Sequence, residues 1–245
     1  MRDGLRLALT TFTVLPVRAG RVDRPAAAVA MALAPLVGAA LGAAVGGAAV
    51  GLRAAGAPPL VAGGAAVALA ALLTRGLHLD GLADTADGLG SYRSGPAALE
   101  IMKRPDIGPF GVAALVAVLL LQAASLATVP WPAAVAAFAT GRLAVTWACR
   151  RGVPAARPDG LGALVAGTVG WPALTVATAA VAALAVPAVA GRPWQGPLAV
   201  ALALAAALLL VRHAVHRLGG VTGDVLGAAV EASTTVALVA LTLRG

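Results

Sequence analysis

Long stretches without any charged side chain constrain the fold of this chain more than any other feature. Between Arg24 and Arg53 lie 28 uncharged residues, and 21 more separate Arg53 from Arg75. A helix needs about 20 consecutive apolar residues to cross the hydrocarbon core of a bilayer. Only 11% of the 245 residues are charged and 60% are hydrophobic, which leaves too little polar surface for a soluble core of this size. The runs are continuous, whereas the strands of a membrane β-barrel alternate. The sequence therefore predicts an all-α protein, a polytopic helical membrane bundle.

We count about seven transmembrane helices within one integral-membrane domain that covers residues 1–245. The predicted spans are residues 28–51, 57–77, 110–129, 132–149, 168–190, 194–212 and 225–243. The third and fourth spans are separated at Pro130-Trp131-Pro132, because proline cannot continue a helix interior. Glycines four residues apart at 38, 42 and 46 predict close packing of the first span against a neighbour.

The charged residues gather on one side of the predicted bundle. With seven spans, 14 of the 18 basic residues fall on the side of the N-terminus, and the ten acidic residues lie on or near that side. The positive-inside rule then predicts a cytoplasmic N-terminus in the cell (inner) membrane. Residues 1–25 form a cytoplasmic segment whose amphipathic part is predicted to lie on the lipid bilayer, not a cleaved signal peptide. The net charge is +8, but the basic residues are scattered through short loops, which argues against nucleic-acid binding.

The most informative stretch is HLDGLADTADGLG, residues 78–90, where the second apolar run stops. Asp80, Asp84 and Asp87 are spaced i, i+4, i+7 and share one face of a helix. Two unit charges about 5 Å apart cost roughly 3 kcal/mol at an effective dielectric of 20, and a divalent cation would remove that cost. Ligation by oxygen alone selects Mg²⁺, Mn²⁺ or Ca²⁺. The alternative is a solvated acidic helix end.

A second acidic pair lies in GGVTGDVLGAAVE, residues 219–231. Asp224 and Glu231 are seven residues apart, and Glu231 falls about two turns inside the last span. Ionisable residues inside a membrane are candidates for function by default. The glycine-rich turn, with Gly220 and Gly223, can approach a ligand closely and offer amides to phosphate oxygens. Its alternative role is a helix cap, for which Thr222 or Asp224 is well suited.

Several basic residues could accompany these acids. Arg142 lies deep inside the fourth span and is expected to pair with an acid or to bind an anion. Lys103 and His78 lie near the acidic stretch in the sequence. For His213 and His216, near one helix end, a structural role and a catalytic role are equally open.

Missing motifs narrow the chemistry. A single cysteine, Cys149, excludes a disulfide framework and cysteine-based metal sites. The sequence contains no P-loop, no GxSxG and no HExxH motif. Carboxylates with hard-metal spacing, arginines for anions and no nucleophile motif together favour phosphoryl chemistry assisted by a metal.

The motifs resemble those of the cobalamin synthase family, the adenosylcobinamide-GDP ribazoletransferases. The similarity covers Phe12 to Pro16, the stretch at 78–90, LEIMK (99–103), GPFG (108–111) and GGVTGDVLGAAVE. The family usually places an acid directly after the basic residue of LEIMK, whereas here Arg104 follows and the acid is Asp106, so the role of Asp106 is open. The aspartates at 80–87 also partly resemble the acidic motif of CDP-alcohol phosphotransferases.

The resemblance implies an Mg²⁺-dependent transferase at the end of cobalamin biosynthesis. Adenosylcobinamide-GDP and alpha-ribazole, or its 5′-phosphate, would give adenosylcobalamin, or its 5′-phosphate, and GMP. The hypothesis assigns roles to the residues as follows: metal ligands Asp80, Asp84, Asp87 and Asp224; proton acceptor Asp224 or Glu231; substrate-binding residues His78, Lys103, Arg142, Gly220, Thr222 and Gly223.

Two other classes compete with this enzyme. An ion-coupled transporter of an anionic substrate would also use buried acids, but secondary transporters usually contain repeats and midplane sites. A non-catalytic membrane scaffold would not explain clustered carboxylates. A homo-oligomer is a further expectation that the sequence does not decide.

Overall fold

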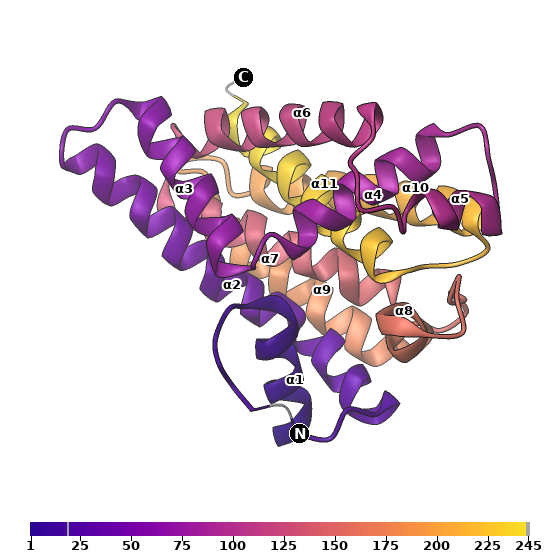
Figure 1. The fold of residues 1–245 in the computed structure, drawn as a ribbon. Coiled ribbons are helices and arrows are strands. Elements are labelled where there is room, and N and C mark those ends of the chain that lie inside the picture. Colours follow the sequence, from indigo (N-terminus) through magenta and orange to yellow (C-terminus); the bar gives the residue numbers. More distant parts are fainter. Residues whose placement is uncertain (19, 244–245) are drawn as a thin grey trace.

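The computed structural model describes residues 1–18 and 20–243, and these form helices joined by short loops (Figure 1). The helices are α1 (Arg2–Phe12), α2 (Arg24–Ala54), α3 (Pro59–Leu73), α4 (Leu77–Gly90), α5 (Pro96–Ile101), α6 (Pro109–Leu126), α7 (Trp131–Ala148), α8 (Gly160–Val165), α9 (Trp171–Ala185), the 3₁₀ turn η1 (Val186–Ala188), α10 (Gln195–Leu218) and α11 (Gly223–Thr242). No strand occurs in this described part, so the prediction of an all-α fold is confirmed.

Prolines begin many of these helices. Six of them (α2, α3, α5, α6, α7 and α9) carry a proline at their first or second position. Proline suits this place because its fixed φ is helical and its missing N–H would have no partner there. The apolar runs locate the start of each helix only to within a few residues. The prolines mark these starts more closely.

Each predicted span coincides with a helix, but not every helix can cross a membrane by itself. Within the described residues, five helices (α2, α6, α9 with its 3₁₀ turn, α10 and α11) are long and apolar enough, and the bent pair α3–α4 would make six. The second predicted span was too long, because α3 ends at Leu73 and α4 turns away from it by 92°. Arg75 and Gly76 both have positive φ at this bend, where a right-handed helix cannot continue. The count of seven stays a prediction.

Helix α7 lies at the centre of the bundle. It packs against α2, α9, α10 and α11, and all its residues except Trp131, Pro132 and Trp147 are buried. The glycines of α2 permit this contact: a Cβ on Gly42 would lie 2.7 Å from Ala134 O, and one on Gly46 would lie 2.6 Å from the Ala134 Cβ. The glycine spacing thus serves close helix packing, as predicted.

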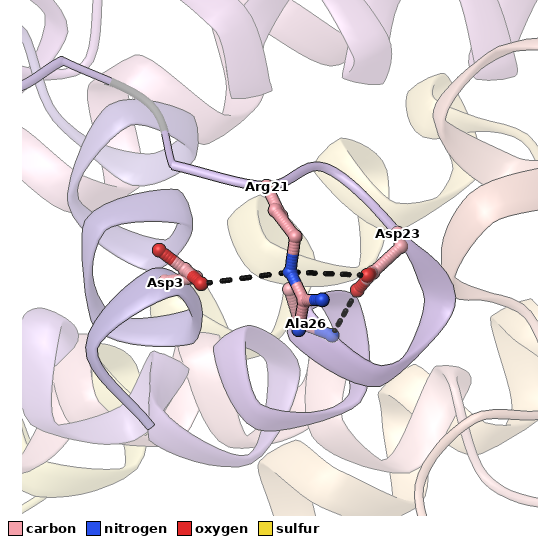
Figure 2. A network of polar contacts seen from close by, with 4 residues as sticks. All are labelled: Asp3, Arg21, Asp23 and Ala26. Atoms are coloured by element: carbon pink, nitrogen blue, oxygen red, sulfur yellow. Dashed lines mark hydrogen bonds and ion pairs between the residues drawn. The ribbon is translucent and has the colours of Figure 1, made fainter.

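The N-terminal helix α1 packs on α2, burying Leu7, Ala8 and Phe12. Figure 2 shows Arg21 between two carboxylates, with its Nε 3.8 Å from Asp3 and 3.7 Å from Asp23. Asp23 also accepts a 2.8 Å hydrogen bond from the Ala26 N–H and so caps α2. The amphipathic face predicted for residues 1–25 therefore rests at least partly on protein.

Hydrogen bonds join the loops at one end of the bundle. Arg53, at the end of α2, donates to the carbonyls of Leu126 and Val129 at the end of α6. Gln195 donates to the carbonyls of Ala240 and Leu243 at the end of α11. These side chains satisfy carbonyls that a helix end leaves unpaired. The acidic motifs lie at the other end, where α4, α5 and α8 gather (Figure 1).

Candidate functional site

A cavity of about 370 Å³ opens at this second end of the bundle. Its wall comes from segments that are far apart in the sequence: Thr11, Phe12, Met31, Leu77, His78, Lys103, Val145, Arg157, Asp159, Gly160, Leu161, Gly162, Val221, Thr222, Gly223, Asp224, Leu226 and Gly227. Of the residues predicted from the sequence, His78, Lys103, Thr222, Gly223 and Asp224 line it.

The crossing of α4 and α11 brings the two acidic motifs together. A Cβ on Gly81 would lie 2.7 Å from Asp224 O, and one on Gly227 would lie 3.2 Å from the His78 Cα. Each glycine therefore lets the backbone of one helix approach the other. Asp80 and Asp84, on either side of Gly81, are placed near Asp224 as a result.

Asp84 and Asp224 are half-buried, whereas Asp80 is exposed; Asp84 lies on α4, the helix that follows the apolar α3. Burial raises the pKa of its carboxyl to about 6, and the negative charges of Asp80, Asp224 and Asp87 act in the same direction. Arg157 acts against them. This is the mutual repulsion expected from the sequence, and it makes the group receptive to a cation.

Asp87 has a different environment from the other acids. It is buried, its Oδ2 accepts a 2.7 Å hydrogen bond from the Gly108 N–H, and its Oδ1 accepts a 2.9 Å bond from the Gly111 N–H. These amides belong to the N-terminus of α6, where N–H groups lack partners within the helix. Asp87 therefore caps α6, because the N-cap residue Gly108 has no side chain that could do so. The two glycines of the GPFG segment lack the Cβ atoms that would collide with the Asp87 carboxylate. The role of Asp87 as a metal ligand stays a prediction.

Lys103 and Arg157 bring positive charge to the cavity. Lys103 follows α5 and lies 3.4 Å from Glu100. Arg157 donates a 2.8 Å hydrogen bond from Nη2 to the Leu99 carbonyl, so the LEIMK segment positions both cations. Among the described residues the buried Nε of Arg157 has no hydrogen-bond partner.

The glycine-rich turn before α11 has mixed roles. Gly220 packs tightly on the backbone of residues 154–156 and does not line the cavity. Thr222 is the N-cap of α11: its hydroxyl accepts from the Val225 N–H at 3.2 Å and donates to Asp224 at 3.1 Å. Thr222 therefore both caps α11 and lines the cavity, two roles that the sequence analysis left open.

Arg142 and Glu231 lie in a separate, smaller cavity between α3, α6, α7 and α11. Arg142 is buried over the ring of Phe138, and the charge of Glu231 acts on it. Glu231 accepts a 2.7 Å hydrogen bond from Gln122. That Arg142 pairs directly with an acid stays a prediction. The structure does not bring either residue into the wall of the larger cavity.

A divalent cation suits the donors at the crossing in type and charge, since Asp80, Asp84 and Asp224 offer only oxygen. They do not form a closed ligand set: within residues 1–18 and 20–243 no three side chains of His, Cys, Asp or Glu are grouped as a metal site requires. Arg157 and Lys103 add charges suited to phosphate oxygens.

Some sequence candidates lie elsewhere, and some wall residues were missed. His213 and His216 are exposed on α10, and Asp106 is exposed before α6, so none of them lines the cavity. Arg157 and Asp159 were not singled out. The signal available was a short charged loop, residues 150–159, on the same predicted side as the acids.

These features define a polytopic membrane protein with a cavity at one end of the bundle, whose largely apolar wall carries Asp159, Asp224, Arg157 and Lys103, while Asp80, Asp84 and Asp87 lie outside that wall. The chain belongs to the cobalamin-5-phosphate synthase family, whose model matches residues 4–242.

Curated relatives agree with this family over the whole length of the chain. An adenosylcobinamide-GDP ribazoletransferase of Frankia casuarinae is 44% identical, over 97% of this chain and 94% of the relative. Proteins of the same name are 43% identical in Nocardioides sp., over the full length of both chains, and 38% identical in Chlorobaculum tepidum, over 100% and 98%. No solved structure matches the chain.

Proposed function

We propose that this protein is an adenosylcobinamide-GDP ribazoletransferase. It joins adenosylcobinamide-GDP to alpha-ribazole, or to alpha-ribazole 5′-phosphate, and releases GMP. One observation carries the proposal: four of the segments that resemble the family, at residues 12–16, 78–90, 99–103 and 219–231, contribute to the wall of a single cavity. Neither transport nor scaffolding accounts for that convergence together with the names of the relatives.

The reaction exchanges the phosphoanhydride bond of the donor's pyrophosphate for a new phosphate ester bond to the acceptor. A ribose hydroxyl of the acceptor attacks the phosphorus on the cobinamide side of the pyrophosphate, and the bond from that phosphorus to the bridging oxygen breaks. Asp224 accepts the hydroxyl proton, because it lies in the cavity wall whereas Glu231 does not. Arg157 and Lys103 bind phosphate oxygens and the charge that develops on GMP.

Mg²⁺ is the proposed cofactor, held by Asp80, Asp84 and Asp224. When bound, it would neutralise the pyrophosphate and stabilise the leaving phosphate. Asp87 supports the site from the α6 N-terminus. We further propose that the cavity faces the cytoplasm from the cell membrane, as the distribution of basic residues favours.

GMP release tests this function directly. Detergent-purified protein is given adenosylcobinamide-GDP and alpha-ribazole, first with Mg²⁺ and then with excess EDTA. We expect release only when Mg²⁺ and the acceptor are both present, with Asp224→Asn as the inactive comparison. A folded protein that releases no GMP with either acceptor would contradict the proposal, and release that persists in EDTA would remove the metal from it.

A further inference from the structure

We propose that the 370 Å³ cavity is the binding site of the acceptor, alpha-ribazole or its 5′-phosphate, with the aromatic base against Phe12 and His78. The corrinoid part of the donor then stays outside, and only its pyrophosphate reaches the carboxylates. This inference rests on the proposed function and assigns the two substrates to different places.

The polarity of the wall changes along α11. Asp224, in the first turn of α11, lies beside Gly81, whereas Gly227, one turn further in, lies beside His78. Apolar side chains from four helices accompany His78 in the wall: Phe12 from α1, Met31 from α2, Val145 from α7 and Leu226 from α11. Of the charged residues of the wall, Lys103, Arg157 and Asp159 come from the loops and Asp224 from the first turn of α11. A molecule with an apolar aromatic part and a polar sugar matches this gradient.

Two aromatic rings meet in the inner part of the wall. The ring centroids of Phe12 and His78 are 6.1 Å apart, and the rings are stacked at an interplanar angle of 21°. Both side chains are almost completely buried. The Nδ1 atom of His78 has no hydrogen-bond partner among the described residues, although buried polar atoms nearly always have one. A stacked pair with one unsatisfied polar atom suits a flat heteroaromatic base.

The size of the cavity separates the two substrates. Pockets for small ligands span roughly 300 to 1,000 Å³, so a cavity of about 370 Å³ lies at the small end. A nucleoside with a two-ring base fits this volume, whereas a corrin macrocycle that carries an adenosyl group does not.

The N-terminal helix closes this part of the wall. Arg75 donates a 2.9 Å hydrogen bond to the Thr10 carbonyl, and the Val14 N–H donates at 2.7 Å to the Leu73 carbonyl. These bonds hold the end of α1 against the bend between α3 and α4. The base therefore meets a wall built by segments that are far apart in the sequence, and Phe12 and His78 become residues that select the base.

Two variants test the assignment: Phe12→Leu, which keeps an apolar side chain, and His78→Asn, which keeps a polar one. Loss of an aromatic contact should raise the KM for alpha-ribazole by about tenfold. The KM for adenosylcobinamide-GDP should stay within about twofold of wild type. His213→Asn, an exposed histidine on α10, is the matched control and should change neither KM.

Binding without turnover gives an independent measurement on the unchanged protein. Alpha-ribazole alone, without the donor, should raise the Tm of the purified wild-type protein, and Phe12→Leu should need a higher concentration for the same shift. No Tm shift in wild type at concentrations above the KM overturns the inference, and so does a variant that raises the donor KM instead. These results differ from a failure of the proposed function, in which wild type releases no GMP at all.

Discussion

At the scale of single residues, the aspartates of one motif are divided between two tasks. Asp84 is half-buried among like charges beside Asp224, whereas both oxygens of Asp87 accept backbone N–H groups of α6. The shared helix face that predicted a common metal site is real, but a face is three turns long and touches different neighbours along its length. Substitutions at the two positions should therefore have different consequences.

Asp84→Asn should mainly affect turnover. The change removes a charge from the proposed metal site without enlarging the side chain, so we expect GMP release to fall by roughly a hundredfold or more. The Tm should stay close to that of wild type. Asp106→Asn is the matched control, because Asp106 is exposed and is not among the carboxylates whose charges act on Asp84. Near-normal turnover of a folded Asp84→Asn protein would remove this residue from the site.

Arg142 is buried and Glu231 lies in the same small cavity, so the two charges should be tested together. Removing one leaves the other uncompensated, which typically costs about 3–5 kcal/mol for a buried pair. We expect Arg142→Leu to lower the Tm more than the double variant Arg142→Leu/Glu231→Gln does. Thermal unfolding of the single and double variants measures this, and strictly additive losses would mean that the two groups do not interact.

At the scale of elements, the crossing of α4 and α11 determines where the carboxylates meet. Gly81→Ala puts a methyl group 2.7 Å from the Asp224 carbonyl oxygen, and because this neighbour is backbone, one helix must move. We expect turnover to drop by at least about tenfold, since small misplacements of reacting groups are costly. Gly64→Ala is the control: nothing lies within 4 Å of its added Cβ, and alanine favours a helix. Equal activity of both variants would mean that the crossing tolerates displacement.

The anchoring of α6 by Asp87 has its own test. Asp87→Ala leaves two N–H groups at the start of α6 without their acceptor, and loss of a helix cap costs about 0.5–2 kcal/mol. We expect a lower Tm and faster hydrogen exchange at the first turn of α6. If exchange there is unchanged, Asp87 does not hold this helix end, and a direct role at the metal becomes the better explanation.

Much of the element structure could be predicted, and the exceptions have physical causes. Apolar runs mark each spanning helix, and the glycines of α2 correctly indicate close packing, although the sequence does not tell that the neighbour is α7. The bend after Leu73 was not predicted, because two residues with positive φ leave no mark on hydropathy. The partner of Asp87 was also missed, since it is backbone 21 residues further along the chain. The place of Arg157 in the cavity wall was not predicted either, because it depends on how distant segments of the chain pack together.

At the scale of the whole molecule, the two ends of the bundle should face opposite sides of the membrane. Ala55 follows α2 at one end of the bundle, and Ser94 precedes α5 at the other end (Figure 1). Both residues are exposed. In intact cells, an impermeant maleimide should label Ala55→Cys and not Ser94→Cys, and permeabilised cells should reverse the protection of Ser94→Cys. The native Cys149 is buried and should not react. Labelling of Ser94→Cys in intact cells would place the carboxylates outside the cytoplasm.

The cavity wall joins the beginning of the chain to its last helix: Phe12 lies in the first helix and Asp224 in the first turn of α11. During synthesis the ribosome must therefore deliver α11 before the wall can close. A nascent chain halted anywhere before α11, or a fragment from which a protease has cut that helix, contains only an open half. We therefore expect such a fragment to release no GMP, because it lacks Asp224 and the rest of the wall that α11 contributes.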